Sequence, residues 1–114
     1  MHELGIAHSI AEQVCEAANE ANASRIDVVH LRVGVLSGVA IEPLCGCWEI
    51  VTHETIAKNS KLICCQVDAS IYCRGCAHVV TVAECWRLCC PTCGVFSNDL
   101  RTGRELEIVS LECS

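Results

Sequence analysis

The chain has 114 residues, of which 52% are hydrophobic and 4% aromatic, and its formal net charge is −6. This length suits one compact domain, or a small domain with an appendage. No apolar run approaches the roughly 18 residues that a membrane helix requires, and an acidic chain with few aromatic residues is a poor nucleic-acid binder. We therefore expect partners that are proteins or small ions.

The first half of the chain predicts a helix, a strand and a second helix. Apolar residues recur at three- and four-residue steps over 3–22, which predicts a helix with one apolar face. Apolar and polar residues alternate over 25–34, which predicts a half-buried strand that ends at a glycine. Pro43 suits the first turn of the second helix, where its missing N–H costs nothing. The inner face of that helix is expected to carry Leu44, Trp48, Val51 and Thr55.

The second half predicts a strand over 61–67, a cysteine-rich insert and a final strand over 104–112. In the final strand, Leu106 and Ile108 lie on one phase of the alternation, whereas Val109 and Leu111 lie on the other. This change of phase predicts a bulge or the burial of both faces.

Twelve cysteines are the most unusual feature of the composition. Disulfide-rich scaffolds are typical of small secreted domains that lack a core, but the start of this chain has neither the basic nor the apolar segment of a signal peptide. We therefore expect the reducing cytoplasm, where cysteines serve as metal ligands or as small buried hydrophobic residues.

The insert contains two Cys-x2-Cys pairs separated by 13 residues, namely Cys73, Cys76, Cys90 and Cys93. Each pair can chelate one ion, and two pairs complete a closed tetrahedral zinc site of the structural kind. Cys89 competes with Cys90 as the third ligand, but only Cys90 gives the two-residue spacing to Cys93. Disulfides or a redox dithiol are the alternative, although a thioredoxin-type motif should lie beside a βαβ pattern, which is missing.

The other cysteines have no clean spacing for a second site. We interpret most of them as packing residues or exposed bystanders, while an adventitious soft-metal site remains open. They are Cys15, Cys45, Cys47, Cys64, Cys65, Cys85, Cys89 and Cys113.

The first three residues, Met1, His2 and Glu3, form a candidate chelate. The α-amine of Met1 with the amide and imidazole nitrogens of His2 can close fused rings around one ion. Nitrogen donors in a plane suit Ni(II) or Cu(II), and the first N–H groups of a helix have no intrahelical partners. A solvated terminal histidine is the alternative interpretation.

The MHE start, the LRVGVLSGV stretch, the Cys-x2-Cys…Cys-Pro-x-Cys-Gly insert and the terminal EIVSLE together resemble the HypA/HybF family of hydrogenase nickel-incorporation proteins. The resemblance spans essentially the whole chain. It implies a nickel metallochaperone for NiFe hydrogenase, or for urease, that binds Ni(II) at Met1, His2 and Glu3 and holds structural Zn(II). The zinc ligands that it implies are Cys73, Cys76, Cys90 and Cys93.

The fold that the resemblance implies is α+β, with a three-stranded sheet packed against two helices and a zinc-ribbon-like domain inserted before the last strand. We therefore expect a nickel-binding domain formed by 1–68 and 104–114, and a zinc-binding domain formed by 69–103. His78, inside the zinc loop, is expected to be exposed, or alternatively to exchange with a thiolate when nickel binds.

The implied partners are a HypB-type GTPase and the large subunit of the hydrogenase, with the chain itself a monomer or homodimer. No combination of a nucleophile with acid–base groups indicates an enzyme. The alternative function is a zinc-ribbon module that binds proteins and carries no nickel.

Overall fold

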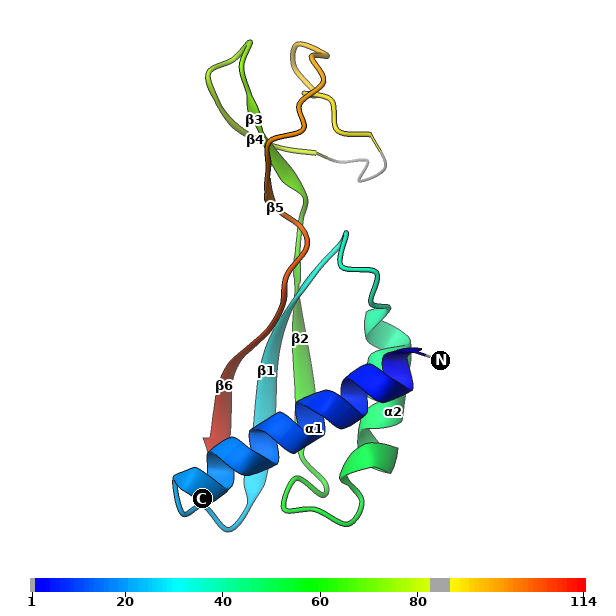
Figure 1. Ribbon diagram of the computed structural model, residues 1–114, viewed down its shortest axis with the longest axis vertical. Coiled ribbons are helices and arrows are strands. Elements are labelled where there is room, and N and C mark those ends of the chain that lie inside the picture. Colours follow the sequence, from blue (N-terminus) through cyan, green and yellow to red (C-terminus); the bar gives the residue numbers. More distant parts are fainter. Residues whose placement is uncertain (1, 83–86) are drawn as a thin grey trace. The chain divides into compact units, whose positions relative to one another are not determined.

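The computed structural model describes residues 2–82 and 87–114, so the predictions for Met1 and Cys85 lie outside the described residues. Two helices alternate with strands in the first half of the chain, and short strands follow (Figure 1). The elements are α1 (His2–Glu20), β1 (Ile26–Gly34), α2 (Ile41–Thr52), β2 (Lys61–Val67), β3 (Ser70–Cys73), β4 (His78–Thr81), β5 (Leu100–Thr102) and β6 (Leu106–Cys113).

The chain forms two compact units. The first unit comprises 1–31, 40–65 and 107–114, and the second comprises 32–39 and 66–106. The domain boundaries expected from the sequence instead place 32–39, 66–68 and 104–106 in the nickel-binding domain. No helix within the described ranges is long and apolar enough to cross a membrane.

Helix α1 buries one apolar stripe and ends two residues earlier than the periodicity predicts. Asn22 has a φ of 59°, the left-handed conformation that commonly closes a helix. The Ala23 N–H donates to the Ala18 carbonyl at 2.9 Å, and the Asn22 N–H donates to the Asn19 carbonyl at 3.0 Å. These bonds satisfy carbonyls of the last turn. The buried residues of α1 are Ala7, Ile10, Ala11, Val14 and Ala18.

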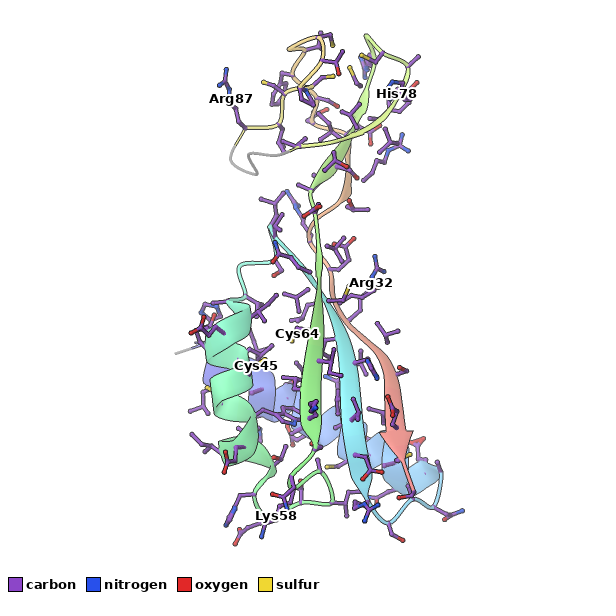
Figure 2. All side chains as sticks on the ribbon, turned by 180° about the vertical axis from the view of Figure 1, so that it is seen from behind. Arg32, Cys45, Lys58, Cys64, His78 and Arg87 are labelled. Carbon is purple, nitrogen blue, oxygen red and sulfur yellow. The ribbon has the colours of Figure 1, made fainter. Side chains whose placement is uncertain are left out.

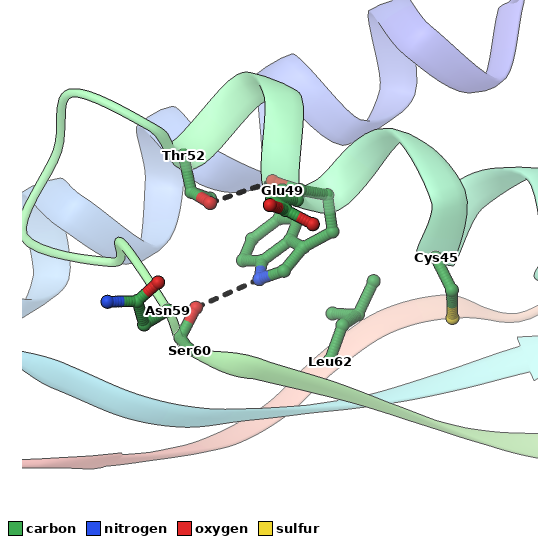
Figure 3. Close-up of a pocket in the computed structure, with 7 residues that line it drawn as sticks. Cys45, Glu49, Thr52, Asn59, Ser60 and Leu62 are labelled. Carbon is green, nitrogen blue, oxygen red and sulfur yellow. Dashed lines mark hydrogen bonds between the residues drawn. The ribbon is translucent and has the colours of Figure 1, made fainter.

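Helix α2 buries Leu44, Trp48 and Thr52. The expectation for Thr55 was wrong, because the helix ends at Thr52 and Thr55 is exposed. The Thr52 hydroxyl donates to the Trp48 carbonyl at 2.7 Å, and the Trp48 indole N–H donates to the Ser60 hydroxyl at 2.9 Å (Figure 3). The second bond ties α2 to the residue before β2.

The larger sheet has the strand order β2-β1-β6. Figures 1 and 2 show α1 and α2 on one face of this sheet. Alternate residues of β1, namely Val29, Leu31 and Val33, are at most 1% exposed, which is the half-buried pattern that the sequence predicts.

Strand β6 departs from its prediction. Val109 is 56% exposed and Leu106 is 41% exposed, so the alternative that both faces are buried was wrong. The physical reason is position: β6 lies at an edge of the sheet, where only Ile108 and Leu111 are partly covered.

The second unit contains a small sheet of order β4-β3-β5, in which both pairs are antiparallel. Its core is Ala69, Ile71 and Val82. These strands are not predicted by the sequence, because three or four residues are too few to show a period.

Two glycines let backbone segments of the second unit approach closely. A Cβ added at Gly34 would overlap the Gly103 carbonyl, and Gly103 itself has a φ of 126°. The Leu36 N–H donates to the Gly103 carbonyl at 2.6 Å. Any side chain at Gly34 would therefore force these segments apart.

Candidate metal centres

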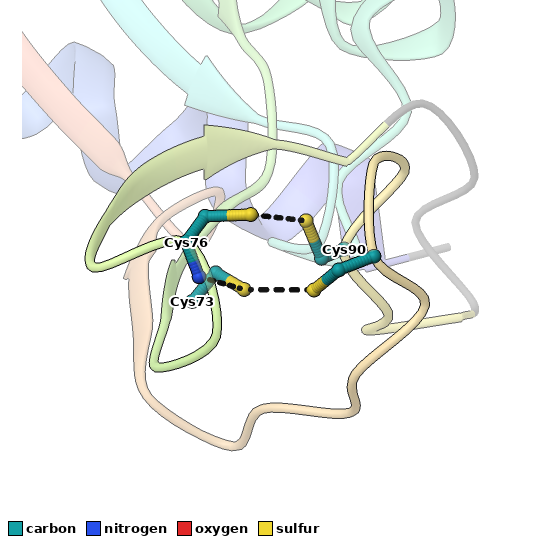
Figure 4. Close-up of side chains that lie close together, drawn as sticks. Cys73, Cys76 and Cys90 are labelled. Atoms are coloured by element: carbon teal, nitrogen blue, oxygen red, sulfur yellow. Dashed lines mark hydrogen bonds between the residues drawn. The ribbon is translucent and has the colours of Figure 1, made fainter.

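The sulfurs of Cys73, Cys76, Cys90 and Cys93 gather in the second unit, and all lie within 4.8 Å of one another. The Cys73 and Cys93 sulfurs are 3.3 Å apart, and the Cys76 and Cys90 sulfurs are 3.8 Å apart (Figure 4). A tetrahedral ion with metal–sulfur bonds of about 2.3 Å spaces its sulfurs by about 3.8 Å. The donor set therefore fits one tetrahedral ion. Among residues 2–82 and 87–114, this is the one group of three or more metal-ligating side chains.

The two Cys-x2-Cys pairs are held by equivalent turns. The Ala77 N–H donates to the Cys73 carbonyl, and the Gly94 N–H donates to the Cys90 carbonyl, both at 2.8 Å. Both donor residues are left-handed, with φ values of 59° for Ala77 and 77° for Gly94. Because the same turn occurs twice, each pair presents its two sulfurs from one compact loop.

The structure distinguishes the two adjacent candidates for the third ligand. Cys90 is buried and its sulfur joins the cluster, and its N–H donates to the Val95 carbonyl at 2.9 Å. Cys89 instead pairs with Phe96 in an isolated bridge and lies outside the cluster.

Hydrogen bonds shift the pKa values of two thiols of the cluster in opposite directions. The Cys93 backbone N–H, assisted by that of Thr92, lowers the pKa of Cys90 to about 6. Hydrogen bonds to the sulfurs of Cys90, Cys93 and Cys73 raise the pKa of Cys76 to about 12. The lowered pKa favours the thiolate form of Cys90, which is the form that binds a metal ion.

His78 does not join the cluster. It begins β4, is exposed, and its Nδ1 lies 3.2 Å from the Val79 carbonyl oxygen. The exposed alternative of the sequence analysis agrees with this position.

The second candidate centre lies at the start of α1. The Nε2 atom of His2 lies 2.7 Å from Oε2 of Glu3, and their side chains are 63% and 14% exposed. The Ala40 N–H donates to the same oxygen at 3.2 Å. Because Ala40 caps α2, Glu3 joins the starts of the two helices.

The environment of Glu3 determines which nitrogen of His2 carries the proton. The hydrogen bond from Ala40 lowers the pKa of Glu3 below its ordinary value, so the carboxyl group is ionised at neutral pH. An ionised carboxylate only accepts hydrogen bonds, so Nε2 of His2 donates. In the neutral imidazole, Nδ1 then carries the lone pair.

Sequence reasoning missed two relationships in the first unit. One is the contact between Ala40 and Glu3, and the other is a pair of sulfurs, Cys45 and Cys64, 3.9 Å apart. The spacing of residues in the sequence predicts neither contact, because each contact joins elements that meet only through tertiary packing.

Comparisons with known proteins agree with this architecture. A sequence model described as "Hydrogenase/urease nickel incorporation, metallochaperone, hypA" matches residues 1–113. The hydrogenase maturation factor HypA of a Roseiflexus species is 38% identical over 112 residues, which cover 98% of this chain and 91% of that protein. The factor of the same name from Chloroflexus aurantiacus is also 38% identical, and the match covers 98% of both chains.

Two solved structures share the fold. The solution structure of the Ni metallochaperone HypA from Helicobacter pylori has a TM-score of 0.65 and 21% identity, over 97% of this chain and 96% of that one. A second HypA solution structure has a TM-score of 0.70 and 23% identity, over 100% of this chain and 97% of that one. At these identities the likeness concerns the fold, and it confirms the α+β class expected from the sequence.

The family match and the two relatives each span nearly the whole chain, and they confirm the resemblance seen in its motifs. The chain therefore belongs to the HypA family of nickel-incorporation and hydrogenase maturation metallochaperones.

Proposed function

We propose that the chain binds one Ni(II) ion at its N-terminus and delivers it for the maturation of NiFe hydrogenase, while Zn(II) at the four cysteines organises the second unit. The observation that carries the nickel proposal is the contact between His2 and Glu3. Copper(II) favours similar donors, so the assignment of nickel rests on the family.

The nickel donors in this proposal are the α-amine of Met1, the amide nitrogen of His2 and Nδ1 of His2. Nδ1 can close a small chelate ring with the amide nitrogen of its own residue, whereas Nε2 lies on the far side of the imidazole. The contact with Glu3 supports this arrangement, because it leaves the lone pair on Nδ1. Planar nitrogen donors suit Ni(II).

The carboxylate of Glu3 is a positioning group in this proposal. The carboxylate orients His2 and is held by the Ala40 amide. Partners of this kind fix the tautomer and the ring orientation of metal-binding histidines. The ionised carboxylate also adds negative charge near a helix N-terminus, where a cation is otherwise disfavoured.

The zinc ion has a structural role in this proposal. The buried hydrophobic cluster that the described residues of the second unit form is small and consists of Ala69, Ile71 and Val82. Small units of this kind depend on metals or disulfides for stability. The closed set of four sulfurs leaves no position for a substrate, as is typical of structural zinc sites.

Nickel delivery requires partners, and we propose a HypB-type GTPase and the hydrogenase large subunit, acting in the cytoplasm. Hydrogenase is the client that the names of the relatives support, with urease as a second. The chain carries its ion without changing a covalent bond of a substrate, so we propose no enzymatic activity.

A nickel titration of the untagged, zinc-loaded protein tests the proposal, with His2→Ala compared to His8→Ala. His8 is a matched control, because it is exposed on the same helix and lies 3.4 Å from Glu12. His2→Ala should weaken nickel binding by more than about a hundredfold, since the loss of an outer-shell partner alone costs about 10- to 100-fold. His8→Ala should bind as the wild type does, with zinc content unchanged in both variants.

Equal nickel affinity in the two variants would refute the N-terminal site. A wild-type protein that holds zinc and binds no nickel would favour the alternative function, a protein-binding zinc-ribbon module.

A further inference from the structure

Cys45 of α2 and Cys64 of β2 form a sulfur pair in the first unit, separate from the four-cysteine cluster of the second unit. Their sulfurs lie 3.9 Å apart and both are free thiols. Figure 2 labels the two residues on their helix and strand. The pair joins two elements through side chains that the N-terminal centre does not use.

A role in packing accounts for the presence of Cys64 but not for that of Cys45. Cys64 is half-buried, as is usual for a free cysteine, but Cys45 is exposed. Cys45 lies at one end of a cavity of about 380 Å³, into which Glu49 also projects one helical turn later (Figure 3). The cavity gives a small cation access to the Cys45 sulfur, and the Glu49 carboxylate makes the approach acidic.

The separation of the sulfurs resembles that of metal-bound thiolates more than that of a disulfide. It is close to the 3.8 Å between Cys76 and Cys90 in the cluster. Two sulfurs on opposite sides of one ion would be about 4.6 Å apart, with metal–sulfur bonds of about 2.3 Å. A disulfide needs about 2.05 Å, so the sulfurs must move less to bind an ion than to bond with each other.

We propose that Cys45 and Cys64 form a two-thiolate site for a soft monovalent metal ion, of which Cu(I) is the biological example. Thiolates select soft ions of this kind. Within the described residues, no third His, Cys, Asp or Glu ligand atom lies close enough to complete a site for an ion that needs more donors. On binding, each thiol loses a proton to solvent and two sulfur–metal bonds form, with no change in oxidation state.

The environment of Cys64 favours its protonated thiol. Burial, together with the neighbouring Cys45, raises the pKa of Cys64 to about 12. The thiolate is the form that attacks disulfides and peroxides, so Cys64 is a weak nucleophile at neutral pH. A soft cation can still displace the proton, because it bonds directly to sulfur.

An anaerobic Cu(I) titration of the reduced, zinc-loaded protein tests the proposal, with a chromophoric Cu(I) chelator as competitor and zinc release followed in parallel. The wild type should bind one Cu(I) per chain without losing zinc, and X-ray absorption should show two sulfur neighbours. Cys45→Ser should weaken this binding by more than tenfold. Matched controls are Cys47→Ser on the same helix and Cys65→Ser next to Cys64, and both should bind as the wild type does.

Three results would overturn the proposal: unchanged Cu(I) affinity in Cys45→Ser, an equal loss in the two controls, or release of zinc by the first equivalent of Cu(I). Cys45 is exposed, so its replacement leaves the fold intact, which circular dichroism and zinc content can verify. Cys64→Ser, at a half-buried position, provides a second variant that should lose the same equivalent of Cu(I).

Discussion

The Nε2 atom of His2 lies 2.7 Å from an oxygen of Glu3 that also accepts the Ala40 amide, 37 residues away in sequence. The start of α1 is thereby fixed against the start of α2. A histidine at the end of a chain is ordinarily mobile, but this one has an oriented ring. The contact orients the imidazole of His2, which the proposed nickel site uses.

Replacing Glu3 by glutamine should weaken nickel binding by about 10- to 100-fold, the usual cost of losing an outer-shell partner of a metal ligand. The amide keeps the shape of the side chain but loses the charge, and it no longer dictates which nitrogen of His2 carries the proton. Competition titration against a nickel chelator measures the effect. Glu12→Gln is the matched control, because Glu12 contacts His8 on the same helix. An equal loss in both variants would mean that only the overall charge matters.

Replacing Cys73 by serine should abolish stoichiometric zinc binding and disorder the second unit. The reason is that Cys73 is fully buried and supplies one of four converging sulfurs. Metal analysis and an amide NMR spectrum measure the two effects. Cys89→Ser is the matched control, since Cys89 adjoins a proposed ligand but lies outside the cluster, and it should retain one zinc per chain. Stoichiometric zinc in Cys73→Ser would exclude the four-thiolate site.

Two glycine replacements should change stability in opposite directions. A Cβ at Gly34 would overlap the Gly103 carbonyl, so Gly34→Ala should destabilise the protein by about 1–3 kcal/mol, as overpacking usually does. Gly46 lies in α2 with nothing near the place of its Cβ, so Gly46→Ala should stabilise by about 1 kcal/mol through helix propensity. Urea unfolding measures both free energies. A Gly34→Ala variant as stable as the wild type would contradict the close approach at Gly34.

The elements with a long, regular period could be predicted from the sequence. The apolar stripe of α1 and the alternation of β1 follow directly from burial on one face. The gathering of the four cysteines could be anticipated from spacing, because each Cys-x2-Cys pair is presented by one local turn. Each of these features depends on residues that are close together in the sequence, so the sequence alone predicts it.

The remaining features depend on contacts between distant segments. The contact of Glu3 with Ala40 and that of Cys45 with Cys64 exist only because α2 packs beside α1 and β2. Strands of three or four residues, such as β5, carry no detectable period. The exposure of Val109 follows from the place of β6 at the sheet edge, which alternation within the strand does not reveal.

The most direct test of the central claim is the spectrum of bound Ni(II) after a Gly-Ser extension is added before Met1. The extension preserves every side chain but converts the proposed α-amine ligand into an ordinary amide nitrogen. The account predicts that the unextended protein gives a diamagnetic, square-planar Ni(II) spectrum. The extended protein should lose that spectrum as completely as His2→Ala, with zinc still bound. An unchanged square-planar spectrum and affinity in the extended protein would contradict the account.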